Sequence, residues 1–128
     1  MATRSTIALE FADGTVQQIY CHWDGYLAAN GNTLLKHYNT PAAVAELLAL
    51  GDLSGLAETP EESVFYGRDK GETNVASRRY DSFDQYLSEG ETESYNYIMR
   101  DGVWYVDRGD YDKFITLIDA FKNEEERI

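Results

Sequence analysis

Most of the residues that could do chemistry lie together between Ile19 and Tyr26, at the exit of a predicted strand. This segment holds the chain's single cysteine, Cys21, one of its two histidines, His22, and one of its two tryptophans, Trp23. In an extended strand, adjacent side chains point to opposite faces, so Cys21 and His22 cannot form a thiolate–imidazole pair there. We therefore expect a buried structural thiol rather than a nucleophile.

A metal site needs a tighter arrangement than the sequence provides, and a carboxylate pair for acid–base catalysis cannot be located among the 23 acidic residues. His22 and Asp24 lie two residues apart, and His37 follows thirteen residues after Asp24, whereas a metal ion needs three or four convergent ligands. The segment from Gly67 to Gly71 is no phosphate loop, because it neither follows a clear strand nor opens a helix. We predict no metal, no cofactor and no catalytic residue, and we expect that the protein is not an enzyme.

Arg78 and Arg79 form the one basic cluster in an acidic half of the chain. They have two interpretations: ion pairs with a neighbour such as Asp81 or Asp84, or recognition of a phosphate or carboxylate. Trp23 and Tyr26 likewise form either a core plug at the strand exit or the floor of a site. If the loop before Arg78 folds over that exit, a small anionic-ligand pocket would form. Its residues would be His22, Trp23, Asp24, Tyr26, Arg78 and Arg79.

The charge of the chain restricts its partners. The formal net charge is −12, of which residues 1–50 carry −2 and residues 51–128 carry −10. Direct binding to nucleic acid is disfavoured, because phosphate contacts need Lys and Arg. An acidic half either keeps a protein soluble or presents carboxylates to a basic partner. The partner-binding candidates are Glu89, Glu91, Glu93, Asp107, Asp110 and Asp112.

Length and composition predict a single α+β domain over residues 1–128. One cysteine excludes an internal disulfide, and no apolar run reaches the length of a membrane span. The first residues show no signal-peptide pattern, so we expect a cytoplasmic protein without membrane contact. The ten Tyr against five Phe indicate either β-rich packing or a binding surface.

Two Asp-Gly turns predict two β-hairpins. The first joins strands over residues 6–12 and 15–22 through a two-residue type I′ turn at Asp13-Gly14. Its register would pair Ile7 with Tyr20, and it would turn Ile7, Leu9, Phe11, Val16 and Tyr20 toward the core. The second joins residues 94–100 and 103–107 through Asp101-Gly102. An antiparallel sheet built from these hairpins, with helices packed on one side, is the predicted architecture.

Helix signals are strongest after Thr40, which is a predicted N-cap followed by Pro41, with Gly51 closing the helix. Residues 26–38 are weakly helical, and Ser82 opens a short helix that ends at Gly90. Residues 52–56 are expected to form a turn and residues 64–66 a short strand. Residues 111–122 predict a terminal helix, and residues 123–128 a frayed tail. Single strands at the sheet edges could pair with a second copy, so a homodimer is an open alternative.

Several stretches carry a family resemblance, and they are most specific in the first half of the chain. They are residues 3–8 (TRSTIA), 13–15 (DGT), 19–26 (IYCHWDGY), 34–38 (LLKHY), 48–54 (LALGDLS) and 95–97 (YNY). In these the chain resembles a family of small proteins from bacteriophages and prophages. The resemblance implies a phage accessory gene expressed in a bacterial cytoplasm, and it carries over no catalytic residue and no substrate.

The expected function is non-catalytic binding. The first hypothesis is a small acidic protein that inhibits a host protein, in defence or nucleic-acid processing, through its acidic C-terminal half. The alternative is capture of a small anionic or nucleotide signal in the aromatic–Arg pocket, and a small enzyme is the second alternative. Salt separates the first two, because contacts between exposed charges weaken with ionic strength more than contacts in a dry pocket.

Overall fold

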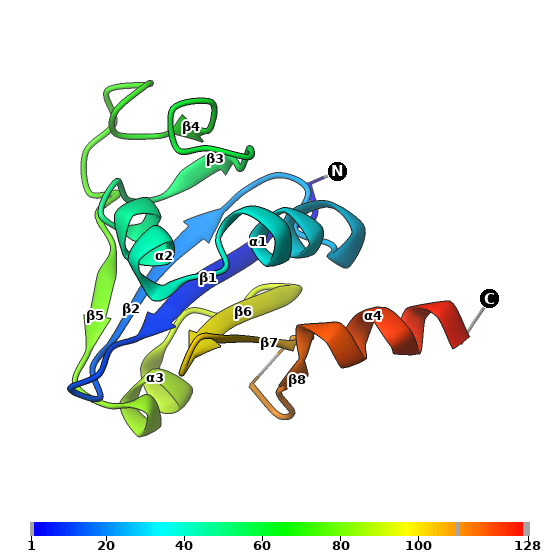
Figure 1. Ribbon diagram of the computed structural model, residues 1–128. Helices are drawn as coiled ribbons and strands as arrows, with labels where there is room; N and C mark the ends of the chain where they lie inside the picture. The colour runs from blue at the N-terminus through cyan, green and yellow to red at the C-terminus, as the bar shows by residue number, and fades with distance from the viewer. Residues whose placement is uncertain (1, 110, 127–128) are drawn as a thin grey trace.

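Strand β1 (Ser5–Glu10) lies inside an eight-stranded sheet in the computed structural model, which describes residues 2–109 and 111–126 (Figure 1). It pairs antiparallel with β2 (Val16–Cys21) and parallel with β6 (Tyr95–Arg100). The sheet is therefore mixed. The prediction of an antiparallel sheet is wrong, because the two hairpins are joined by the pairing of β1 with β6, and these two strands run parallel.

Short strands complete the sheet on both sides of this centre. The order is β4-β3-β2-β1-β6-β7-β8, and β5 pairs with β2 beside that path. One side of β2 is taken by β1 along its whole length. On the other side, β3 pairs with the end of β2 at Cys21 and β5 pairs with the opposite end, at residues 16–18. The bounds of these strands are β3 Leu53–Gly55, β4 Val64–Phe65, β5 Arg78–Tyr80, β7 Val103–Asp107 and β8 Ile115–Thr116.

The first hairpin differs from its prediction by one residue. Phe11 donates its N–H to Thr15 O over 2.8 Å, and Gly14 donates to Phe11 O over 2.9 Å. These bonds enclose a loop of three residues, 12–14, in which Gly14 has φ +87°. The predicted type I′ turn would have had a loop of two residues. Asp13 favours the three-residue loop, because its Oδ1 accepts hydrogen bonds from the N–H and the hydroxyl of Thr15.

The extra loop residue changes which side chains share a face. Ile7 now pairs with Ile19 instead of Tyr20. Ile7, Leu9 and Ile19 enter the main core, whereas Val16 belongs to the cluster on the opposite face. The predicted core face of this hairpin is therefore wrong for its second strand, as a one-residue shift in register requires.

The second hairpin has the predicted turn and register. Asp101 and Gly102 both have positive φ, +51° and +77°, as a type I′ turn needs. Met99 pairs with Trp104 and Ile98 with Tyr105, which confirms the predicted pairs. Apolar residues line both faces of this hairpin, because both faces of the sheet are covered there.

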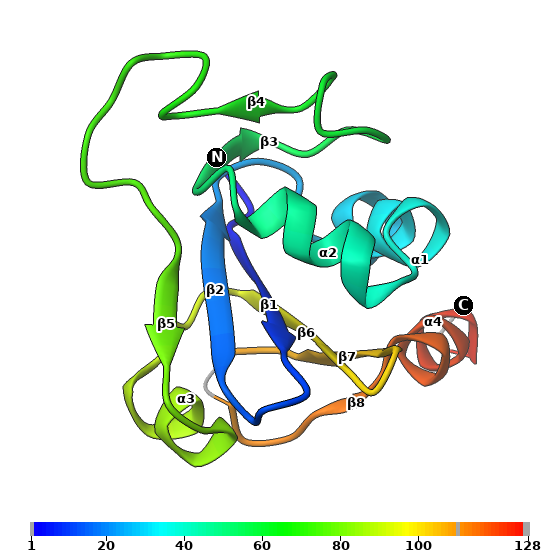
Figure 2. The ribbon, with the colours of Figure 1, turned by 60° about the vertical axis from the view of Figure 1, so that its left-hand side comes forward.

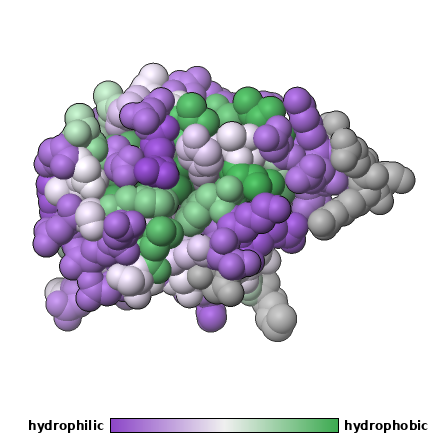
Figure 3. All heavy atoms as spheres, turned by 90° about the horizontal axis from the view of Figure 1, so that it is seen from below, coloured by the Kyte–Doolittle hydropathy of each residue, from purple (hydrophilic) through white to green (hydrophobic). Residues whose placement is uncertain are grey.

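Helices pack on both faces of the sheet, which corrects the expectation of helices on one side. Residues from the π-helix Leu27–Gly31, α1 (Asn32–His37), α2 (Pro41–Leu48) and α4 (Leu117–Glu126) join the main core. Helix α3 (Phe83–Glu89) packs against the other face, below the sheet in Figure 1. Seen from that lower side, hydrophobic groups lie among hydrophilic ones (Figure 3).

The helix caps follow the sequence signals. Thr40 Oγ1 accepts the N–H of Ala43 over 3.2 Å, and Ser82 Oγ accepts that of Gln85 over 3.0 Å. The C-terminal prediction is less accurate. Helix α4 begins at Leu117 instead of residue 111 and continues to Glu126, through most of the expected frayed tail; residues 127–128 lie outside the described residues.

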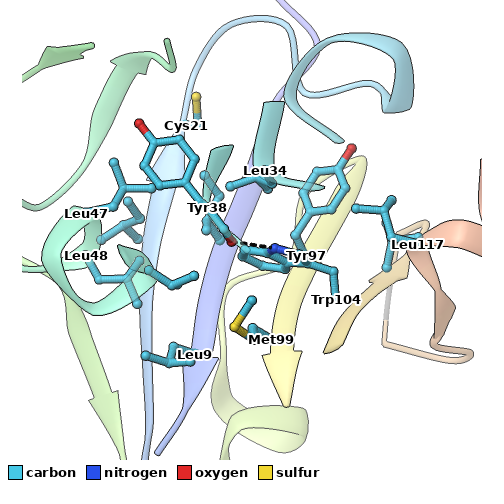
Figure 4. Packing of buried hydrophobic residues seen from close by; sticks show 14 of the residues in the cluster. Leu9, Cys21, Leu34, Tyr38, Leu47, Leu48, Tyr97, Met99, Trp104 and Leu117 are labelled. Atoms are coloured by element: carbon cyan, nitrogen blue, oxygen red, sulfur yellow. Dashed lines mark hydrogen bonds between the residues drawn. The ribbon is translucent and has the colours of Figure 1, made fainter. Parts of the chain in front are cut away.

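Buried tyrosine and tryptophan side chains in the main core satisfy their polar atoms on backbone carbonyls. Trp104 Nε1 donates to Tyr38 O over 2.8 Å (Figure 4), and Tyr38 Oη donates to Ala57 O over 2.8 Å. Tyr97 Oη donates to Gly25 O over 2.7 Å. These bonds let large amphipathic rings fill the core without leaving a buried hydroxyl or indole N–H unpaired.

Residues 52–81 contain three short strands instead of the expected turn and one strand. Leu53 pairs with Cys21 in parallel orientation, so residues 53–55 form β3 and not a turn. The short strand predicted at residues 64–66 is present as β4. Over residues 2–109 and 111–126, no helix has both the length and the apolarity needed to cross a bilayer.

Candidate functional site

The segment after β2 forms a sharp corner held by backbone hydrogen bonds. His22 N donates to Leu53 O and Trp23 N to Ser54 O, each over 3.0 Å, so the backbone stays bonded to β3 for two residues after β2 ends at Cys21. Asp24 then reverses the chain at φ +59°, a conformation that Asp tolerates better than most residues. The corner is thus built from the end of β2 and its neighbour β3.

Gly25 fixes this corner against the first residues of the chain. Its N–H donates to Thr3 O over 2.8 Å, and its carbonyl accepts the Tyr97 hydroxyl. A Cβ at this position would lie 2.8 Å from Ser5 Cβ and 2.9 Å from the carbonyl carbon of Arg4. The backbone therefore packs too closely for any other residue, and the corner is held in place.

The aromatic side chains of the corner lie at the surface. Trp23 is 46% exposed and Tyr26 is 43% exposed, so the core-plug interpretation is wrong for both. His22 meets the Trp23 ring edge-on at 4.7 Å, and its Nδ1 lies 2.7 Å from Tyr20 Oη. The result is a row of partly exposed aromatic rings at the C-terminal end of β2.

Cys21 lies beneath this row as a buried thiol. The Asn30 side chain donates to Cys21 Sγ over 3.4 Å and to Trp23 O over 3.1 Å. Burial raises the pKa of the Cys21 thiol to about 11, and the Asn30 hydrogen bond offsets only part of that increase. The thiol is therefore protonated at neutral pH, as a structural cysteine should be.

Arg78 is held by acidic residues that the sequence did not indicate. Its Nη1 and Nη2 donate to Asp52 Oδ2 and Oδ1 over 3.0 and 2.9 Å, and Nη2 also lies 3.3 Å from Glu91 Oε2. Desolvation is the largest single effect and lowers the pKa of Arg78, but the hydrogen bonds to Asp52 and the negative charges of Asp52 and Glu91 together outweigh it, so the pKa is raised. Asp52 also accepts the N–H of Tyr20 over 2.8 Å. This ion pair joins β2, β5 and the start of β3.

Arg79 lies toward the other end of β2. It pairs with Gln17 in the strand register, and its Nη2 is 3.9 Å from Asp13 Oδ2 and 3.1 Å from Thr15 Oγ1. Six residues of extended chain separate Gln17 from Trp23, a span of about 20 Å. The structure brings His22, Trp23 and Tyr26 together but places Arg79 apart from them, so the predicted ligand pocket is not assembled.

The acidic residues predicted to bind a partner differ in their exposure to solvent. Glu89 and Glu91 are exposed, Glu93 is half-buried, and Asp112 is exposed. Asp107 is buried and accepts the N–H groups of Tyr111 and Lys113 over 2.7 and 3.1 Å, so it shapes the loop after β7 and is not presented to a partner. Asp110 lies outside the described residues.

Most of the arginines are engaged within the protein. Arg68, Arg78, Arg79, Arg100 and Arg108 each lie within ion-pair distance of a carboxylate. The exposed pairs contribute little stability, but each one neutralises a cation at the surface. The negative charge of the protein is therefore carried by carboxylates outside these pairs.

Two hollows were not expected from the sequence. One, of about 290 Å³, lies between α4 and the chain around Arg108 and Lys113. The other, of about 540 Å³, lies between the first turn of α2 and the two Asp-Gly hairpins. Each is lined by segments far apart in the chain, and no local sequence signal could have indicated them. Within the described ranges, no group of three His, Cys, Asp or Glu residues could hold a metal ion.

Comparison of the chain with protein families, curated proteins and solved structures found no match.

Proposed function

We propose that the protein acts by non-catalytic binding, with its acidic C-terminal half docking on the basic surface of a bacterial host protein and inhibiting it. The observation that carries this proposal is the group of exposed carboxylates just before α3, along it and in the loop that follows it. Asp81, Asp84, Glu89 and Glu91 are all exposed there. The choice of a bacterial host protein as the partner belongs to this proposal and follows from the resemblance to phage proteins.

The neighbouring cation does not neutralise this surface. Arg78 pairs with both Asp52 and Glu91, so one guanidinium is shared by two carboxylates. A surface with excess negative charge attracts a basic partner over about one Debye length, roughly 8 Å at physiological salt. It accelerates association and rejects acidic competitors such as nucleic acid.

Capture of a small anionic ligand at the aromatic corner has less support. Of the two cations proposed for that pocket, Arg78 is bound bidentately by Asp52 and Arg79 interacts with Asp13. An enzyme has no support from Cys21, because that thiol is buried and its pKa is raised to about 11. Binding through surface carboxylates requires neither a free arginine nor a reactive thiol.

The test is purification of the tagged protein from bacterial lysate, followed by native mass spectrometry and affinity measurement with the recovered host protein. Glu89→Lys should weaken binding by about tenfold, and Glu89→Lys with Glu93→Lys by more. Glu72→Lys is the matched control for Glu89→Lys, since Glu72 is an exposed carboxylate in the loop between β4 and β5 and the charge change is identical. Unchanged affinity in the double variant would contradict the proposal. A bound mass of a few hundred daltons, in place of a protein, would favour ligand capture.

A further inference from the structure

The groove beside α2 is formed by three backbone turns. Its walls come from the loop of the first hairpin, the first turn of α2 and the Asp101-Gly102 turn of the second hairpin, and its volume is about 540 Å³. These three segments approach one another at one end of the sheet (Figure 2). The volume lies within the range of roughly 300–1,000 Å³ that is common for ligand pockets.

The lining is apolar, and its charged residues are acidic. Leu9, Phe11 and Ala45 supply apolar surface, while Glu10 and Asp101 are the two charged residues among the ten that line the groove. Glu10 is paired with Arg100 over 3.2 Å. Asp101 is exposed at the tip of its turn. An apolar floor with the Asp101 carboxylate at its rim matches an apolar side chain that has a cation beside it.

The walls of the groove are fixed before any partner binds. Gly14, at φ +87°, and the two positive-φ residues Asp101 and Gly102 hold the two hairpin turns. Thr40 caps the first turn of α2, and Leu9 is 1% exposed at the groove floor. A preformed site of this kind loses little conformational entropy on binding.

We propose that this groove receives apolar anchor residues from a basic segment of the protein partner. The inference rests on the proposed function, because it names the second contact that the same partner would make. Two apolar residues at i and i+4 on one face of a helix fit such a groove, and flanking Lys or Arg residues approach Asp101. A second copy of this chain is a poor occupant, because two molecules that each carry −12 repel one another.

The probe is a synthetic amphipathic helix of Leu and Lys, with Leu at i, i+3, i+4 and i+7. Its affinity is measured by amide chemical-shift titration of the full chain. We expect shifts at Ala42, Ala45 and Gly102, and we expect Ala42→Trp to weaken binding by about tenfold by filling the groove. Ala49→Trp is the matched control, because Ala49 is also exposed but lies at the far end of the same helix.

A second variant tests the rim without filling the groove. Asp101→Asn keeps a residue that tolerates positive φ and removes the charge. This variant should lower the affinity for the Leu–Lys peptide by about threefold and reduce the salt dependence of the binding. A peptide with Ser in place of Leu should lose the shifts at Ala42 and Ala45.

The outcomes separate the groove from the acidic surface. If Ala42→Trp and Ala49→Trp bind the peptide equally well while Glu89→Lys weakens it, the groove proposal is overturned and the acidic surface is supported. If Ala42→Trp and Asp101→Asn both weaken binding while Glu89→Lys has no effect, the groove is supported and the proposed docking surface fails. No shift with the Leu–Lys peptide, or equal affinity of the Ser peptide, overturns the groove.

Discussion

Cys21 should make this protein less stable as the pH rises above 9. The side chain is fully buried in the main core, where desolvation raises the pKa of its thiol from 9.0 to about 11. The unfolded chain exposes the thiol to water and restores its ordinary pKa. Between pH 9 and pH 11, the thiol of Cys21 therefore loses its proton more readily in the unfolded chain than in the folded one.

The sign and size follow from proton linkage. Between pH 9 and pH 11 the unfolded chain has released the thiol proton and the folded chain retains it, so rising pH favours unfolding. The contribution is fully present below pH 9 and falls by about 1.4 kcal/mol for each unit above it. The loss amounts to about 1.4 kcal/mol at pH 10. Burial also raises the pKa of Tyr86 and Tyr97, which adds a loss in the same direction from about pH 10.

Urea unfolding of the wild type and of Cys21→Ala at about pH 8 and about pH 10 isolates the thiol. The variant is less stable at both values, because it removes a buried side-chain atom. The wild type should nevertheless lose about 1.4 kcal/mol more than the variant between the two values. Equal losses in the two proteins would show that burial does not raise the pKa of Cys21, and the reasoning would be refuted.

Two further substitutions test the contacts that hold the aromatic corner and the strands around it. Asp52→Ala removes the bidentate partner of Arg78 and leaves its guanidinium half-buried, so unfolding free energy should fall by about 3 kcal/mol. Arg79→Ala is its control and should change stability by less than about 0.5 kcal/mol, since both partners of that pair are more than half exposed. Gly25→Ala places a Cβ 2.9 Å from Thr3 O, and urea unfolding should show a loss of about 2 kcal/mol or more; a loss below about 0.5 kcal/mol would contradict the close packing at this corner.

Two turns with the same Asp-Gly pair show what could be predicted and what could not. At Asp101 the strands on either side leave two residues between them, and type I′ geometry follows. At Asp13 the following Thr15 supplies two donors to the Asp13 carboxylate, and the loop becomes one residue longer. The dipeptide predicts that a hairpin exists, but the hydrogen bonds that Thr15 donates to Asp13 accompany a longer loop and a different register.

The segment from residue 52 to 81 could not be predicted because its contacts are distant in sequence. Asp52 reaches Arg78 across 26 residues, and its N–H donates to Val75 O over 2.8 Å. Strand β5 is held on β2 by this ion pair and by its pairing with residues 16–18, which are also distant in sequence. Local propensity contains none of this information, so the positions of Arg78 and Arg79 relative to Trp23 could not be derived from the sequence.

The ion pairs also explain how the acidic charge relates to binding. Pairing five arginines with one carboxylate each leaves 18 of the 23 carboxylates and six of the 11 cations, and these groups together carry the net charge of −12. Excess like charge destabilises the folded state through self-repulsion. A basic partner that docks beside Glu89 relieves part of that repulsion, in addition to forming its own contacts. Salt screens the repulsion and the attraction together. Binding should therefore weaken with ionic strength under conditions in which the free protein becomes more stable.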